Sequence, residues 1–257
     1  AVCIVMMTHG ANVWVAMLCA FLAGMLAGLI TGILHTCMGI PAILAGILTQ
    51  FGLYSINLKI MGKANQAIGA DKYDLLVALR YVKNVPFYKN TIFVVTVVVI
   101  ILIAILYWFF GTEMGCALRA TGCNSNMSRA QGINTNFSKV LGLMISNGLV
   151  GLSGALLCQY QGFADINMGR GAIVIGLAAV IIGEAIFGKI FKNFGLKLLA
   201  AVLGSILYYF VVQTVIWLGI DTDLLKLLSA LVVAIFLAIP TWKSRYFSKP
   251  VRKGGNH

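Results

Sequence analysis

The sequence predicts an all-α protein, a polytopic bundle of transmembrane helices with about seven membrane segments of ~20 residues each. Hydrophobic residues make up 60% of the 257-residue chain and charged residues only 10%, whereas about a quarter of the residues in soluble domains are charged. The mean hydropathy is +0.96. Residues 91–110 contain no charge at all, which is the pattern of one membrane-crossing helix.

The net charge of +12 does not indicate nucleic-acid binding. The basic residues lie in short loops and at the C-terminus beside apolar runs, where cytoplasmic Lys and Arg accumulate in membrane proteins. The six cysteines show no spacing typical of metal ligands, and most lie within apolar runs as small hydrophobic residues. We therefore predict no nucleic-acid partner, no metal and no cofactor.

Residues 1–8 are expected to be the tail of a span that starts before this chain, which predicts an N-terminally truncated protein. Residues 13–34 form the first complete span, and its small residues recur every four positions, which places them on one helix face for close packing: Ala20, Gly24, Gly28 and Gly32. The plainer alternative is that glycine is simply common in membrane helices.

Residues 41–56 follow Gly39 and Pro41 and are short for a span, so a broken or tilted helix is one possibility. Residues 57–90 are the largest hydrophilic stretch, within which residues 73–81 are expected to form a short amphipathic helix.

The later spans are expected at residues 139–160, 171–187, 198–218 and 224–240, before a basic tail at 241–257. In the first of them, three glycines at three-residue spacing are predicted to pack against another helix: Gly148, Gly151 and Gly154. In the second, Glu184 is the one carboxylate inside an apolar run, and we expect it at the cytoplasmic interface near Lys189.

Residues 115–137 interrupt this apolar pattern between two spans. The segment is rich in small residues, carries Arg119 and Arg129, and has helix-capping residues in Asn124, Ser125 and Asn126. It is therefore expected to form one or two short helices outside the lipid.

The same segment resembles the cytoplasmic coupling loop of ABC importer permeases, in particular those of the ribose and branched-chain amino-acid group. The resemblance rests on Gly115, Leu118-Arg119-Ala120, Gly122 and Asn124, followed by Ser128, Ala130 and Gly132-Ile133-Asn134. It continues over residues 1–240, and it is greatest to permeases that work with tryptophan- or tyrosine-binding proteins.

The resemblance implies partners and a site. The partners are a separate ABC ATPase subunit, an extracytoplasmic substrate-binding protein, a second permease copy in a homodimer, and the lipid bilayer of a bacterial plasma (inner) membrane. The solute implied is an amino acid, with aromatic ones as the first candidates. The residues expected to contact the ATPase are Ala117, Leu118, Arg119, Ala120, Gly122, Asn124, Ala130, Gly132 and Ile133.

No phosphate-binding GxxxxGK[ST] run is present, and no set of residues indicates catalysis, so the chain is not expected to be an enzyme. We expect one permease domain over residues 1–257, with an external loop at 57–90, a cytoplasmic coupling loop at 115–137 and a cytoplasmic tail. Most basic residues then lie inside, as the positive-inside rule requires, although the external loop is also basic.

Two alternatives stay open at this point. An ion-coupled secondary transporter needs a carboxylate near the middle of the membrane, for which Glu184 is the candidate. A membrane scaffold that transports nothing is the other. Association with a soluble ATPase distinguishes both from an importer.

Overall fold

The computed structural model of the chain describes residues 1–68, 75–78, 90–169, 172–188, 190, 191, 193–218, 227, 231 and 234. It divides into two compact units, Ala1–Gly169 and Arg170–His257. The predicted all-α membrane fold is confirmed, because the described residues are mostly helical and the strands are very short.

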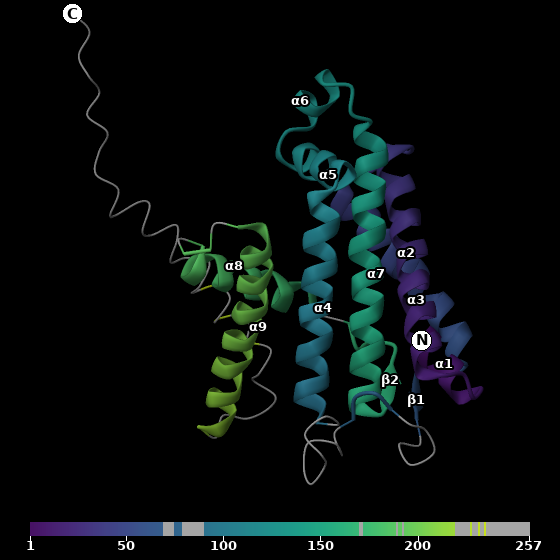
Figure 1. The fold of residues 1–257 in the computed structure, drawn as a ribbon. Helices are drawn as coiled ribbons and strands as arrows, with labels where there is room; N and C mark the ends of the chain where they lie inside the picture. The colour runs from purple at the N-terminus through teal and green to yellow at the C-terminus, as the bar shows by residue number, and fades with distance from the viewer. Residues whose placement is uncertain are drawn as a thin grey trace, which may run out of the picture. The chain divides into compact units, whose positions relative to one another are not determined.

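The first unit contains seven helices and two three-residue strands among its described residues (Figure 1). They are α1 (Val2–Thr8), α2 (Val13–Thr36), α3 (Ala42–Met61), β1 (Asn65–Ala67), α4 (Thr91–Gly111), α5 (Glu113–Cys123), α6 (Ser125–Ala130), α7 (Thr135–Gln161) and β2 (Phe163–Asp165).

The helix α3 is longer than its pattern indicates, and it is unbroken. Pro41 lies at its N-cap, where the missing N–H costs nothing, and Gly62 ends it in the left-handed conformation with φ +67°. Residues 57–61, expected in the hydrophilic loop, belong to this helix. The possibility of a broken helix is therefore wrong, since Gln50 and Asn57 are tolerated within one continuous ladder of backbone hydrogen bonds.

The helices α2 and α7 approach each other at glycine positions, backbone to backbone. A Cβ built on Gly28 would fall on the carbonyl oxygen of Leu143 and lie 2.7 Å from the Cα of Met144, and one on Gly24 would fall on the carbonyl oxygen of Asn147. A Cβ on Gly32 would lie 3.0 Å from the Cα of Val140. Any side chain at these positions would push the two helices apart.

Glycines of α7 contribute to the same contact from the other helix. A Cβ on Gly151 would lie 2.5 Å from the carbonyl oxygen of Ala20, and one on Gly148 would lie 2.8 Å from the Cγ of Met25. Gly154 does not belong to this contact, because among the described residues nothing lies within 4 Å of a Cβ built there. Its position, three residues beyond Gly151, has rotated away from α2.

At one end of the first unit, the segments that follow α3 and α7 meet. The strands β1 and β2 pair antiparallel, with Gln66 opposite Ala164, and Ile68 N–H donates to the Gly162 carbonyl at 2.8 Å. The helices α5 and α6 lie at the other end (Figure 1). The stretch after α3 and the stretch before α7 therefore lie at opposite ends of the helices.

A buried cluster closes the strand end. Cys3, Ile4 and Met7 of α1 pack there with Leu75 and Ala78. The four described residues 75–78 are not helical, so that part of the expected amphipathic helix at 73–81 is wrong. Their backbone is instead held by tertiary contacts: Leu76 N–H donates to the buried Gln159 side chain at 3.2 Å, and the Thr91 hydroxyl donates to the Ala78 carbonyl at 2.7 Å.

The second unit is described by α8 (Ala172–Phe187) and α9 (Phe194–Trp217), which cross at glycines. A Cβ on Gly183 would fall on the Ala200 carbonyl oxygen, and one on Gly204 on the Ala179 carbonyl oxygen. Glu184 is exposed on α8, whereas its expected neighbour Lys189 and the tail 241–257 lie outside the described residues.

Among the described residues, five helices are long and apolar enough to cross a membrane, namely α2, α3, α4, α7 and α9. The remaining two of the seven expected spans differ. Residues 172–187 form the 16-residue helix α8, which is shorter than a full crossing of ~20 residues. The expected span at 224–240 lies outside the described residues except at three isolated positions.

The α2–α7 contact predicts a difference between two glycine-to-alanine changes. Gly28→Ala should destabilise the fold by about 1–3 kcal/mol, because the methyl group has no room against the backbone of α7. Gly52→Ala on α3 has open space, so it should be neutral or stabilising by up to ~1 kcal/mol through helix propensity. Thermal unfolding in detergent measures both, and equal melting temperatures would contradict the contact.

Candidate functional site

The candidate site is the pair of short helices α5 and α6, which connects α4 to α7 at one end of the first unit (Figure 1). Two short helices in this segment confirm the expectation from sequence, although α5 begins at Glu113, two residues earlier than the segment defined there. We refer to residues 112–134 as the hairpin.

The hairpin is connected to α4 by a tight turn. Thr112 ends α4 and starts α5: its hydroxyl donates to the Phe109 carbonyl at 2.6 Å and accepts from Gly115 N–H at 3.3 Å. Gly115 lies so close to the end of α4 that a Cβ would fall on the Phe109 carbonyl oxygen and the Phe110 Cα. The first glycine of the motif is thus required by the abrupt turn between the two helices.

The first helix of the hairpin is seated on α7. Gly142 of α7 provides the space for Leu118, whose Cδ1 lies 3.2 Å from a Cβ built on that glycine. Thr121 is buried, and its hydroxyl donates to the Ala117 carbonyl at 2.8 Å. The hairpin is therefore attached to α7 by side-chain packing as well as by the chain itself.

The turn between α5 and α6 is made by Asn124. Its backbone is extended, with φ −153° and ψ 100°, and its side-chain oxygen accepts from Asn126 and Met127 N–H, both at 3.1 Å. Gly122 lies within α5 and does not make this turn. The turn needs no glycine, because the capping side chain of Asn124 satisfies free N–H groups at the start of α6.

The far end of α6 does need its glycine. Gly132 has φ +81°, Ile133 N–H donates to the Ser128 carbonyl at 3.1 Å, and Gly132 N–H donates to the Arg129 carbonyl at 3.0 Å. This pair of bonds is the Schellman motif, in which a left-handed residue closes a helix. Arg129 also donates to the Thr135 hydroxyl at 3.3 Å, which connects α6 to the start of α7.

The residues expected to contact a partner divide between two faces of the hairpin. Ala117, Leu118, Ala120 and Ile133 are partly buried, and Leu118 packs on α7. The exposed ones are Arg119, Gly122, Asn124, Ala130 and Gly132. Four of these five lack a long side chain, so a partner can approach this face closely.

Sequence reasoning missed two residues of the hairpin: Thr112, which makes the α4–α5 turn, and Met127, which is 47% exposed. Ser128, a residue of the motif, is fully buried, and its hydroxyl donates to the Asn124 carbonyl at 3.0 Å. Thr112 carried a readable signal, since a threonine three residues before the motif glycine fits an N-cap. Met127 had none, because exposure of an apolar residue depends on how the helix sits.

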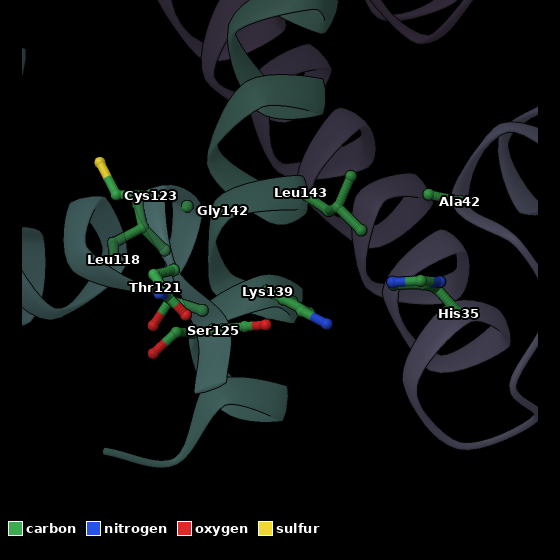
Figure 2. A pocket seen from close by; sticks show the side chains of 12 residues that line it. His35, Ala42, Leu118, Thr121, Cys123, Ser125, Lys139, Gly142 and Leu143 are labelled. Carbon is green, nitrogen blue, oxygen red and sulfur yellow. The ribbon is translucent and has the colours of Figure 1, made fainter. Parts of the chain in front are cut away.

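Behind the hairpin is an open hollow of about 640 Å³. It is lined by α5, the start of α6, the start of α7, and the adjoining ends of α2 and α3 at His35 and Ala42. Figure 2 shows the side chains of Lys139, on α7, and His35, on α2, pointing toward one another. Among the described residues, no group of three His, Cys, Asp or Glu side chains is placed to hold a metal ion.

The hairpin is thus a capped helix pair, held at both ends, with exposed small residues and the exposed side chains of Arg119 and Arg129. The family model of the branched-chain amino acid transport system / permease component matches residues 1–239. The chain belongs to this family. It is thus a multi-pass membrane protein and a transport permease component, not a catalytic subunit.

Two relatives of this permease are informative. It is 41% identical over 232 residues to a tyrosine transport system permease protein of Clostridioides difficile (strain R20291), which covers 90% of this chain and 75% of that one. It is 36% identical over 227 residues to an uncharacterized protein of Rickettsia prowazekii (strain Madrid E), covering 87% and 78% of the two chains. No solved structure matches the chain.

The hairpin predicts opposite outcomes for two glycines of α5. Gly115→Ala should destabilise the protein by about 1–3 kcal/mol, because the methyl group collides with the backbone at the end of α4. Gly122→Ala, seven residues along the same helix, meets nothing within 4 Å and should be neutral or slightly stabilising. Melting curves of the two purified variants test this, and a stable Gly115→Ala would show that the turn is not tight.

Proposed function

We propose that this permease is the membrane subunit of an ATP-driven ABC importer in a bacterial plasma membrane. Two copies form the translocation path, a separate ATPase binds the hairpin, and an extracytoplasmic binding protein delivers the solute. The observation that carries the proposal is the hairpin itself, which is fixed to α4 by Thr112 and Gly115 and to α7 by Leu118.

A contact that transmits force must be ordered at both of its ends. The rigid-body motion of an ATPase moves the membrane part only if the segment between them does not bend. In the hairpin, both ends of α6 are closed, by the Asn124 side chain and by the Schellman turn at Gly132. A passive connector has no need of such closure.

The exposed face of the hairpin suits an acidic or carbonyl-rich groove on the ATPase. Arg119 presents a planar fork of N–H donors, which pairs with carboxylates in a two-pronged geometry. Gly122 and Ala130 allow backbones to approach, and Met127 offers a flexible apolar side chain. These residues together define the proposed ATPase contact.

The opposite end of the first unit is the proposed site of the binding protein. The pairing of β1 with β2 brings the segment after α3 and the segment after α7 to the same end, away from the hairpin. If the hairpin is cytoplasmic, both segments are external, as the loop at 57–90 was expected to be. Lys63, exposed just before β1, is then available to a carboxylate of the binding protein.

The solute is proposed to be an amino acid, and the relative named as a tyrosine transport permease makes an aromatic one the first to test. Uptake that persists when ionophores collapse the ion gradients, but stops when ATP is depleted, supports an importer. The reverse result would favour ion-coupled secondary transport.

The ATPase contact is tested by reversing one charge. Arg119→Glu should leave the permease folded and inserted but reduce solute uptake at least about tenfold, because a like-charge contact in an interface costs several kcal/mol. Lys63→Glu, at the other end, should retain ATPase binding. The measurements are co-purification of the ATPase and uptake in reconstituted vesicles. If Arg119→Glu co-purified the ATPase and took up solute as the wild type does, the proposed contact between the hairpin and the ATPase would be wrong.

Topology is tested by labelling single cysteines in a cysteine-free background. A cysteine at Lys63 should react with a membrane-impermeant thiol reagent in intact cells, whereas one at Asn126 on α6 should react only after lysis, since both positions are exposed but lie at opposite ends. The reverse labelling pattern would place the hairpin outside the cell and refute the importer assignment.

A further inference from the structure

The hollow behind the hairpin has a chemical character that the proposed ATPase contact does not use. Its lining includes Lys139 and the polar side chains of Asn124 and Ser125, together with the apolar side chains of Leu118, Leu143 and Ala42. None of the described residues that line it is acidic. A cavity with a cation, no carboxylate and an apolar wall selects for a net anion that carries an apolar part.

We infer that this hollow binds the head group of an anionic phospholipid, with the phosphate on Lys139 and the lipid body against the ends of α2 and α3. Lys139 is the fifth residue of α7, one turn inside a membrane-length helix, where a lysine reaches up along its apolar stem to the phosphate level. Its ammonium group has no hydrogen bond or ion pair with the part of the chain that the structure describes. Basic hollows between helices at the membrane surface are sites for anionic head groups.

His35 adds a feature on the opposite wall. Its Nδ1 lies 2.8 Å from the Ile40 carbonyl oxygen, which only accepts, so Nδ1 carries the proton and donates. In the neutral ring Nε2 is then an acceptor. A glycerol head group presents hydroxyl donors beside its phosphate, so phosphatidylglycerol matches both walls of the hollow.

The surroundings of the hollow favour a lipid over soluble anions. The α2–α3 connection and the start of α3 expose large apolar side chains, with Met38 67% and Ile43 82% exposed. Such surface in a membrane protein lies against acyl chains. A free amino acid is a poorer match, because its ammonium group would find no carboxylate among the described lining residues.

A bound lipid would connect elements that the chain itself leaves apart. Within the hollow, α5 and the Asn124 turn lie on one side and the α2–α3 connection on the other. A phosphate held between Lys139 and Asn124 would support the hairpin from behind. This role concerns lipid binding and stability, so its test does not depend on whether an ATPase binds the outer face.

The test compares thermal unfolding of the full chain in phosphatidylcholine nanodiscs with and without phosphatidylglycerol. Phosphatidylglycerol should raise the melting temperature of the wild type by roughly 2–4 °C. Lys139→Gln should lose this shift and Lys139→Arg should keep it. The control Lys63→Gln removes an exposed lysine at the opposite end and should also keep it.

Two further arms keep the inference falsifiable. Ser125→Trp fills the hollow without removing a charge and should lose the shift as well, so it replaces Lys139→Gln if that variant does not fold. Inorganic phosphate in phosphatidylcholine should give no shift. An equal shift with inorganic phosphate would identify a soluble anion site, and a full phosphatidylglycerol shift in both Lys139→Gln and Ser125→Trp would overturn the inference.

Discussion

The first unit of this permease depends on the backbone contact between α2 and α7. In lipid, helices gain nothing from the hydrophobic effect when they associate, so close van der Waals packing must hold them together. Gly24 and Gly28 allow the carbonyl oxygens of Asn147 and Leu143 to approach the α2 backbone directly. Other parts of the unit pack on this pair: α5 packs on α7 through Leu118, and the cluster at the strand end packs on α2 and α7.

The helix face that packs in α2 could be predicted from the sequence, because it follows from the periodicity of an α-helix. Small residues every four positions in residues 13–34 lie on one face of any α-helix, whatever the partner, so they mark a contact surface before the partner is known. The prediction from the three glycines of α7 was less accurate. Residues spaced three apart move gradually around the helix, so Gly154 does not share the contact that Gly151 makes with α2. Four small residues spaced four apart therefore identify the contact face of a helix. Three glycines spaced three apart identify it only in part.

The features that the sequence did not predict are set by tertiary contacts. Residues 75–78 have an apolar pattern compatible with a helix, but Gln159 and Thr91 hold their backbone in a nonhelical path. In the hairpin, the existence of two short helices was predictable from the capping residues. The structural reason for each glycine was not predictable. Gly115 is required because α4 lies so close, and Gly132 is required because its φ is positive, whereas neither reason applies to Gly122.

The contacts of Gly115 and Leu118 indicate how the hairpin would act in the proposed importer. Because Gly115 lies against the backbone at the end of α4, a displacement of α5 would move α4 with it. Within its own unit α4 buries only Thr91. Leu118 carries the same displacement into α7, which is locked to α2 and spans to β2 at the far end. A force applied to the hairpin would therefore act both on α4 and on the closely packed α2–α7 pair. Relative motion of α4 against the α2–α7 pair is the change in the membrane part that this geometry favours.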